Sequence, residues 1–432
     1  MKPLPYALLT TLLFAASASA QDTITVPIPP YGAPKFGGPF GGGVPGTKAK
    51  GKGNMSSDAL TPDCPVPWSV NPLDLHGGRQ EGVQLILLNN GKMTITIVPT
   101  RGMGILDVAY SVEDKDGKKD RRIIGWRSPV DEIVNPSFMN LNSRGGLGFL
   151  EGFNEFMCRC GVENIGQPGK DVIVTNTGAK AEVDLTLHGK IANIPARFVE
   201  MVVDKQAPFR IRLRGRVDER MMFGTNLVLH TEISTLPGSM EFRIEDKVIN
   251  KGSQPQEFQM LYHTNIGSPL LEEGARFLAP VTRVIPVNAH SAKDAKTFGD
   301  VAGPTPGIIE QAYFMHPVAG KDGNTIALVH NKARDQGLSL RWPVKQLPYL
   351  TLWKNTAAIE DGYVIGIEPG TSFPNMRRVE RKAGRVPKLD GGKSHTMTID
   401  FGVHFGAAAL EPVLDRIDAL QRTQAAVIEE AP

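Results

Sequence analysis

The 432-residue chain carries 48 Lys and Arg against 45 Asp and Glu, a formal net charge of +3. Basic and acidic residues are interleaved along the sequence, so it lacks the concentrated positive face typical of nucleic-acid binding. This pattern excludes nucleic acid as the expected partner and favours a neutral or small ligand.

Residues 1–20 have the pattern of a secretory signal peptide. A charged start at Lys2 precedes a short apolar stretch over residues 7–16, and the small residues Ala18-Ser19-Ala20 end it, as signal cleavage sites do. We expect cleavage before Gln21 and a secreted or periplasmic mature protein; an uncleaved N-terminal anchor is the alternative. No later segment has about 18 uninterrupted apolar residues, so no membrane span is expected in the mature chain.

The segment 21–68 is dense in Gly and Pro, for example over residues 36–43. Such a composition buries too little apolar surface to offset the entropy lost on ordering, which predicts a flexible linker. We expect one globular domain over residues 69–410 and a C-terminal helical tail over 411–432, with helical periodicity across 411–427.

Short strand-like runs dominate the domain. The runs 83–88 and 93–98 flank Asn90-Gly91, a strong signal for a β-hairpin. More runs of this kind follow at 171–175, 182–187, 198–203, 210–217, 226–233, 241–248, 257–262, 325–329, 349–353, 362–368 and 395–404. Many strands at near-regular spacing, with few helices and no internal repeat, predict an all-β fold, a large antiparallel β-sandwich.

The three cysteines, Cys64, Cys158 and Cys160, cannot all pair with one another. Cys158 and Cys160 would face the same side of one strand about 7 Å apart, which is too far for a disulfide. We expect at least one free thiol, and the spacing is not that of a zinc site.

Two histidines and one glutamate are the leading candidates for chemistry. His188 and His263 lie in polar, Gly-containing contexts, and Glu368 ends an apolar strand immediately before a turn. Burial there raises the pKa of a carboxyl group and suits it to act as a base near neutral pH. The alternatives are purely structural roles: histidines that are hydrogen-bonded within the fold, and a glutamate that accepts hydrogen bonds from turn amides.

Two imidazoles opposed to one carboxylate are the groups needed to open a hemiacetal ring. The carboxylate removes the proton of the anomeric hydroxyl while an imidazolium protonates the ring oxygen. The same groups can epimerise a sugar at another carbon if the base reaches a C–H. The residues therefore leave the reaction type open.

Other polar and aromatic residues are candidates for ligand binding. Arg101 follows the second hairpin strand and is flanked by turn residues that allow close approach of a ligand. Asn164 and Asn265 can form hydrogen bonds with hydroxyl groups. Trp353, like Trp126, can either stack on a sugar ring or fill the core. Arg159, near Asn164 in sequence, can join the same region or pair with an acidic neighbour on the surface.

Cofactor motifs are missing from the sequence. Gly102-Met103-Gly104 lacks the third glycine of a dinucleotide fingerprint, and there is neither a Gly-x-Ser-x-Gly elbow nor a His-Glu-x-x-His pair. We expect no cofactor and no metal.

Five segments in order resemble a bacterial family labelled as an aldose-1-epimerase-like domain of unknown function, DUF4432, over roughly residues 75–405. They are Pro99 to Gly104, Phe149 to Gly166, Leu187 to Ala196, Tyr262 to Leu271 and Gly366 to Pro369.

That family is similar in fold to galactose mutarotase, a β-supersandwich. The resemblance implies His188 as the positioning imidazole, His263 as acid and Glu368 as base, with Asp361 as the candidate for the sugar-binding aspartate of mutarotases. His263 lies in His-Thr-Asn-Ile-Gly rather than the Asn-His-Ser-Tyr-Phe type of sequence familiar from mutarotases.

The leading hypothesis is an isomerase of the aldose 1-epimerase type that acts on a sugar or sugar derivative. The alternatives are a noncatalytic carbohydrate-binding module and a lyase or hydrolase acting on a modified sugar.

Overall fold

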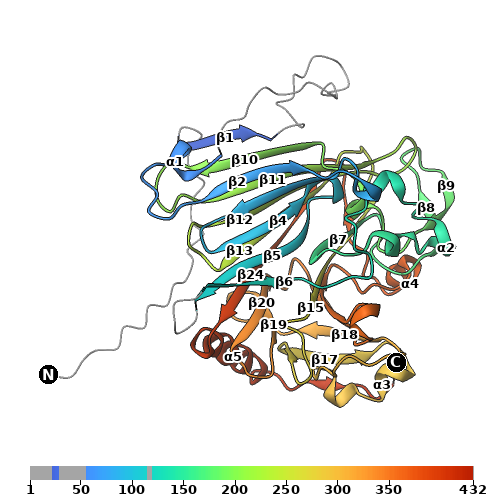
Figure 1. Ribbon diagram of the computed structural model, residues 1–432. Helices are drawn as coiled ribbons and strands as arrows, with labels where there is room; N and C mark the ends of the chain where they lie inside the picture. Colours follow the sequence, from blue (N-terminus) through green and yellow to red (C-terminus); the bar gives the residue numbers. More distant parts are fainter. Residues whose placement is uncertain (1–21, 29–54, 114–118, 432) are drawn as a thin grey trace.

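The computed structural model describes residues 22–28, 55–113 and 119–431. Two large sheets, antiparallel except for the parallel pair at Val281–Pro286 and Val427–Ile428, face each other and enclose the main hydrophobic core (Figure 1). The predicted all-β sandwich is therefore confirmed. No helix in the described part of the chain has the length and apolarity needed to cross a bilayer. The predicted signal peptide, residues 1–20, lies outside the described residues.

The first sheet has nine strands, in which buried and exposed positions alternate along strands such as β11 because one face meets the core and the other meets solvent. Its order is β1 (Thr23–Pro27), β10 (Phe198–Asp204), β11 (Ile211–Arg220), β12 (Asn226–Thr235), β13 (Glu241–Asn250), β24 (Ser394–Phe405), β20 (Gln336–Pro343), β19 (Asn324–His330) and β16 (Arg276–Leu278).

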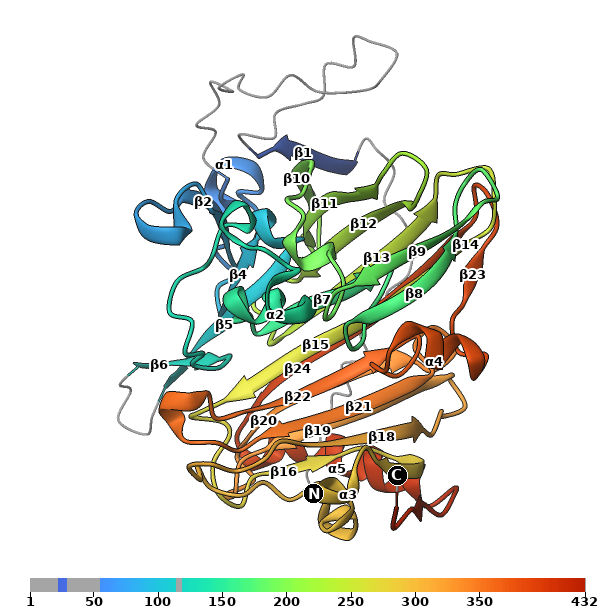
Figure 2. The same ribbon diagram turned by 90° about the vertical axis from the view of Figure 1, so that its right-hand side faces the viewer.

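The second sheet has twelve strands, and its central strands are buried on both faces. Its order is β2 (Ser69–Asp74), β3 (Gln84–Asn89), β4 (Met93–Val98), β5 (Gly104–Glu113), β7 (Met157–Val162), β15 (Gln259–Gly267), β22 (Val364–Gly370), β21 (Tyr349–Asn355), β18 (Gln311–Pro317), β17 (Val281–Pro286) and β25 (Val427–Ile428), with β6 (Lys119–Ile124) paired to β5. Figure 2 shows β15, β22, β21 and β18 side by side.

The remaining elements are short and connect or cover the sheets. Two small sheets are β8 (Gly169–Val174) with β9 (Lys180–Leu185), and β14 (Gln256–Glu257) with β23 (Lys388–Leu389). The helices are α1 (Ser57–Leu60), α2 (Ser143–Gly146), α3 (Ala289–Ala292), α4 (Arg377–Lys382) and α5 (Ala407–Gln421), with single-turn or similarly short 3₁₀ segments at Gly78–Gln80, Pro99–Arg101, Pro136–Phe138, Gly148–Gly152, Ile191–Asn193, Ala295–Thr297 and Ile359–Asp361.

The predicted hairpin and helix are present, with shifted bounds. β3 and β4 pair in antiparallel register around Asn90 and Gly91, and Gly91 has φ +94°, the left-handed region that the turn needs. The C-terminal helix α5 begins and ends earlier than the periodicity over 411–427 predicts. All three cysteines are free. This agrees with the prediction, from their number and spacing, of at least one free thiol.

The segment 21–68 departs from the expectation of a structureless linker in its described parts. Strand β1 adds to the edge of the nine-stranded sheet, and Ile28, Met55 and Trp68 are buried in the main core. These apolar side chains lie on either side of the Gly- and Pro-dense stretch. The average composition of residues 21–68 therefore did not reveal that its two ends pack into the core. The ordered part of the chain therefore begins before residue 69.

Arg159 lies between the two sheets, and the expectation that it binds a ligand or a surface acid does not fit this placement. Its side chain is fully buried and pairs with Asp246 of β13 through two contacts, at 2.5 and 3.1 Å. It also donates to the Thr231 hydroxyl at 2.7 Å and the Met103 carbonyl at 2.7 Å, and the Tyr262 hydroxyl donates to Asp246 at 2.9 Å. This network ties β7 and β15 to the opposite sheet.

Asp246→Asn removes the charge that compensates Arg159 while keeping the side-chain shape. A buried charge without its partner costs about 3–5 kcal/mol, and we expect that loss of unfolding free energy in urea titrations. Asp300→Asn is the matched control, because the Arg276–Asp300 pair is exposed and contributes about 0–1 kcal/mol. Equal effects of the two substitutions would contradict this role of Asp246.

Candidate functional site

Strand β15 sends alternate side chains to two different environments. Tyr262 and Ile266 point into the core between the sheets, whereas Leu261 belongs to a second apolar cluster on the outer face of the twelve-stranded sheet. Because successive side chains of a strand point to opposite faces, His263 and Asn265 share the outer face with Leu261.

The strand register brings His263 and Glu368 together. β15 pairs with β22 as Leu261↔Gly370 and Thr264↔Ile367, so His263 falls opposite Glu368. On the other side, β7 places Cys158 opposite His263. Residues opposite each other in an antiparallel pair share a face, so these side chains form one row on the outer face.

His263 and Glu368 are in direct contact. Nε2 of His263 lies 3.1 Å from Oε1 of Glu368, and the two side chains are 5% and 3% exposed. In a hydrogen bond at this distance, one proton lies between the imidazole and the carboxyl group. The pair therefore holds one proton that can move to either partner or to a bound molecule.

Burial drives both members of this pair toward their neutral forms. It raises the pKa of Glu368 well above its usual 4.5, with the Glu310 carboxylate adding to the rise. It also lowers the pKa of His263 well below 6.5, with His188 adding to the fall. Burial therefore favours the arrangement in which the proton of this contact lies on Glu368 and Nε2 of His263 accepts it.

The site contains buried polar atoms that lack partners within the described chain. They include Nδ1 of His263 and Oδ1 of Asn265, whereas Nδ2 of Asn265 donates to the Glu155 carbonyl at 2.9 Å. Buried polar atoms are almost always hydrogen-bonded. Since Asn265 also acts on His263 as a hydrogen-bonding neighbour that raises its pKa, these two atoms are suited to each other as well as to a ligand or to water.

His188 comes from a loop packed against the outer face. Its Nδ1 lies 2.8 Å from the Ile165 carbonyl, which only accepts, so Nδ1 carries a proton and Nε2 of the neutral ring is an acceptor. Burial lowers the pKa of His188 to about 4. Its ring centroid lies 5.3 Å from that of His263.

Asn164 holds the loop that carries His188. Its Nδ2 donates to the Thr186 carbonyl at 2.9 Å, and the His188 amide donates to Gly166 at 3.0 Å. Nδ2 of Asn164 also donates to the Gly166 carbonyl and Oδ1 accepts from the Gly166 amide, so both ends of the side chain are already used within the loop, which does not fit the expected contact with a ligand. Asn164 positions the imidazole instead.

Aromatic rings surround the two imidazoles. Phe149 packs against His188, with ring centroids 4.9 Å apart, and Phe153 and Trp353 contact His263 at 5.1 and 5.6 Å. Trp353 is partly exposed, so it retains a free surface beside the acid–base pair. An aromatic face next to polar groups suits the mixed surface of a sugar ring.

Gly366 lets the side chains of the pair pack directly against the strand backbone. It lies opposite Asn265 and Trp353 in the register, and a Cβ atom there would lie 2.8 Å from Cε1 of His263 and 3.0 Å from Oε1 of Glu368. A side chain at this position would displace the two reactive groups.

Glu310 is a site residue that the sequence did not reveal. Its Oε2 accepts a hydrogen bond from Nε1 of Trp353 at 2.7 Å, and its charge acts on Glu368. It follows a Gly- and Pro-rich loop over residues 303–307, which carries no catalytic pattern. Phe149 and Phe153 were also missed as site residues, because an apolar side chain in a loop looks the same whether it fills a core or lines a site.

Arg101 and Asp361 do not take the places expected of them. Arg101 is fully buried and pairs with Glu155 at 2.5 Å, also donating to the Val134 carbonyl. It thereby fixes the segment that carries Phe153. Asp361 is exposed at the β21–β22 turn. The four residue steps from Val364 to Glu368 alone span about 13 Å, so Asp361 lies at the far end of this strand from Glu368.

Within the described residues, no three His, Cys, Asp or Glu side chains are arranged to hold a metal ion. The arrangement of His188, His263 and Glu368 supports proton transfer to and from a polar ligand.

Glu368→Gln tests the raised pKa of this carboxyl group through stability. A folded-state pKa above 4.5 means that the native protein binds more protons than the unfolded chain above that pH, so wild-type stability falls as pH rises. We expect the unfolding free energy of Glu368→Gln, relative to wild type, to increase from pH 5 to pH 9 in urea titrations. A difference that does not change with pH would contradict the raised pKa.

Comparison with known proteins identifies the family of this chain. The chain matches the family model "Domain of unknown function (DUF4432)" over residues 80–403. A candidate aldose 1-epimerase from Klebsiella pneumoniae subsp. pneumoniae MGH 78578 has a solved structure that is 39% identical, with a TM-score of 0.79, covering 88% of this chain and 95% of that one.

A galactose mutarotase-like protein from Clostridium acetobutylicum is 13% identical, with a TM-score of 0.53, covering 78% of this chain and 99% of that one, and shares the fold. The comparison with curated proteins finds no match. The resemblance inferred from the five sequence segments is thus confirmed, and the chain belongs to the DUF4432 family.

Proposed function

We propose that this protein binds a sugar or sugar derivative and interconverts its anomers by acid–base chemistry, as an aldose 1-epimerase does. The observation that carries the proposal is the 3.1 Å contact between Nε2 of His263 and Oε1 of Glu368 on a face that His188 also reaches. A binding module needs hydroxyl partners and aromatic rings but no opposed acid–base pair.

The contact suits the anomeric centre because O1 and O5 of a pyranose are both bonded to C1. Ring opening removes the proton of the O1 hydroxyl and adds a proton to O5 as the C1–O5 bond breaks, leaving an aldehyde. For this, the proton shared by the pair first passes from Glu368 to Nε2 of His263 as the sugar binds. Glu368 is then proposed to take the O1 proton and His263 to give its proton to O5. Two neighbouring groups that share one proton can perform both transfers without a net change of charge.

Ring closure reverses the transfers. After opening, Glu368 is protonated and His263 is neutral, the state that burial favours in the free site. Rotation about C1–C2 presents the other face of the aldehyde to O5. Glu368 then protonates O1 as His263 takes the O5 proton, and the opposite anomer forms.

The neighbouring groups support binding and orientation. His188 offers Nε2 as an acceptor for a sugar hydroxyl, since Nδ1 donates to Ile165. Glu310, held by Trp353, is a second acceptor that takes the place expected of Asp361. The 39% identity to the candidate aldose 1-epimerase from Klebsiella supports the same class of substrate.

Anomer exchange measured by NMR across a panel of aldoses tests the proposal with Glu368→Gln and His263→Ala. We expect each to lower kcat/KM about 10²–10⁴-fold, because that is the usual contribution of a general acid or base. His76→Gln is the control, since His76 is exposed and its ion-pair partner among the described residues is the exposed Glu81. Sugar binding without any rate enhancement by the wild-type protein would instead favour a carbohydrate-binding module.

We also propose that the protein acts outside the cytoplasm after removal of residues 1–20. The support is the charged, apolar and small-residue pattern of that segment. Expression in a Gram-negative host and N-terminal sequencing of the periplasmic fraction test this, and we expect Gln21 as the first residue. A product that retains Met1 in the cytoplasm would contradict it.

A further inference from the structure

Strand β11 carries a carboxyl group at a core-facing position, Glu219. Buried residues recur at every second position of this strand, as at Leu213 and Val217, and Glu219 continues the series. It is 5% exposed. Acidic side chains are seldom this buried unless a specific contact compensates them, so the contacts of Glu219 indicate its role.

The carboxyl group of Glu219 reaches across the core to the last residue of strand β7. Its Oε2 accepts a hydrogen bond from the amide of Val162 at 2.9 Å, and this contact is buried. The neighbouring amide of Glu163 also acts on the carboxyl group as a donor. Because β11 belongs to the nine-stranded sheet and β7 to the twelve-stranded one, Glu219 links the two sheets where β7 ends.

Gly161, one residue before Val162, holds the backbone of His188. The Gly161 amide donates to the His188 carbonyl at 3.0 Å, and the Lys190 amide donates to the Gly161 carbonyl at 3.0 Å. His188 has φ +58°, in the left-handed region that is unfavourable for residues other than glycine. This strained conformation therefore depends on its pairing with Gly161.

The residues after Val162 hold the side chain of His188. The Ile165 carbonyl lies 2.8 Å from Nδ1 of the imidazole, and the His188 amide donates to the Gly166 carbonyl at 3.0 Å. The chain on both sides of Val162 thus contacts His188. A displacement of Val162 would move the groups that set both the backbone and the ring of this histidine.

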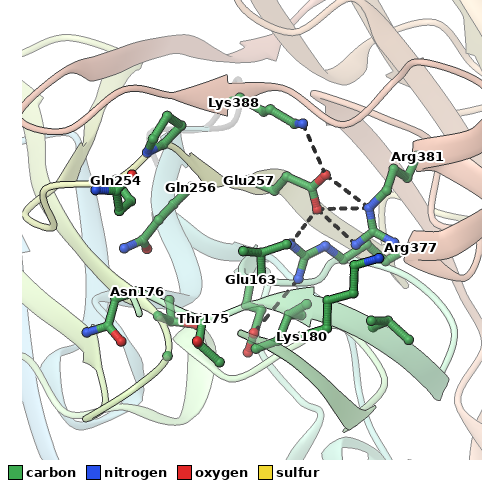
Figure 3. A pocket seen from close by; sticks show the side chains of 16 residues that line it. Glu163, Thr175, Asn176, Lys180, Gln254, Gln256, Glu257, Arg377, Arg381 and Lys388 are labelled. Atoms are coloured by element: carbon green, nitrogen blue, oxygen red, sulfur yellow. Dashed lines mark hydrogen bonds and ion pairs between the residues drawn. The ribbon is translucent and has the colours of Figure 1, made fainter. Parts of the chain in front are cut away.

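Two charged side chains act on Glu219, and they have opposite signs. Glu163 and Lys190 are these groups, and the effect of Glu163 is the larger. Glu163 lines a cavity of about 520 Å³ between the β8–β9 hairpin and helix α4 (Figure 3). Its carboxylate lies 3.8 Å from Arg377 and 3.9 Å from Lys190. The negative charge beside Glu219 is therefore held in place by these two cations.

Burial raises the pKa of Glu219 from 4.5 to about 7, and the Glu163 carboxylate adds to the rise, against the Val162 amide and Lys190, which lower it. The native protein therefore favours a protonated Glu219, whereas a local opening that hydrates the group restores its ordinary pKa. Opening then releases the proton to water and becomes more favourable as pH rises from 4.5 to about 7. Burial lowers the pKa of His188 to about 4, which has the opposite effect, so the contribution of Glu219 is measured between variants that keep His188.

We propose that Glu219 is a positioning residue for His188. By accepting from the Val162 amide, it fixes the chain that pairs with the strained backbone of His188 and orients its imidazole. Glu219 acts through this loop rather than on a ligand. The functional meaning of the role rests on the proposed function, in which His188 accepts a hydrogen bond from a sugar hydroxyl.

Amide hydrogen exchange tests this role without any sugar. Glu219→Leu removes the acceptor. At pH 6, we expect it to lower the protection of the Gly161, His188 and Lys190 amides about 10-fold or more, the usual effect of losing one buried hydrogen bond. Glu219→Gln keeps an acceptor oxygen and should stay within about 3-fold of wild type. Glu245→Leu is the control, because Glu245 is an exposed strand residue of the same sheet.

Unchanged protection of these three amides in a folded Glu219→Leu would overturn the proposal. An equal loss at the amides of the remote β19–β20 pair would also overturn it, because it would indicate global destabilisation. If Glu219→Leu does not fold, the pH dependence decides. The protection of Glu219→Gln relative to wild type should rise up to about 10²-fold between pH 5 and pH 7.5, because opening releases the Glu219 proton only in the wild type. A ratio that is constant over this range would contradict the coupling of Glu219 to the loop.

Steady-state kinetics connect this role to the proposed function. A contact between His188 and a sugar hydroxyl is made in the ground state and in the transition state, so Glu219→Leu should raise KM about 10-fold with kcat unchanged. A lower kcat at unchanged KM would overturn the link to binding by His188. A wild-type protein without epimerase activity would contradict the proposed function instead, and the exchange results would still decide the role of Glu219.

Discussion

The strict alternation of side chains along β7, β15 and β22 is the constraint on which the rest of the structure depends. These strands are buried on both faces, so every residue faces either the core between the sheets or the outer site. A slip of one position would exchange Tyr262 with His263 and carry the imidazole into the core. Arg159, next to Cys158 on β7, resists such a slip because its guanidinium is anchored to Asp246 in the opposite sheet.

The same burial that orders these strands determines the electrostatics of the site. It moves the pKa values of Glu368 and His263 in opposite directions, toward a neutral pair that shares one proton. Keeping both groups out of water, with unpaired atoms nearby on His263 and Asn265, costs stability in the free protein. A bound polar ligand would supply the missing hydrogen bonds, so the cost can be recovered on binding.

Local signals predicted the fold well, but only part of the site could be predicted. The hairpin around Asn90 and Gly91 is encoded by adjacent residues, whereas His263 and Glu368 meet through strand pairing across about a hundred residues. They were grouped from residue type and context, and their individual roles were inferred from a family resemblance. Arg159 was misplaced because alternation along a strand tells which residues share a face but not which face meets the core. Glu310 comes to the site through a loop contact with Trp353, for which the sequence has no signature.

The central claim is that His263 and Glu368 act together on the anomeric centre of a sugar. The most direct measurement is a crystal structure of Glu368→Gln with a bound aldose identified from the substrate panel. The account predicts O1 within hydrogen-bond distance of the side chain at 368 and O5 within that distance of Nε2 of His263. A sugar bound with its anomeric carbon directed away from both residues, or bound only in the cavity of Figure 3, would contradict it.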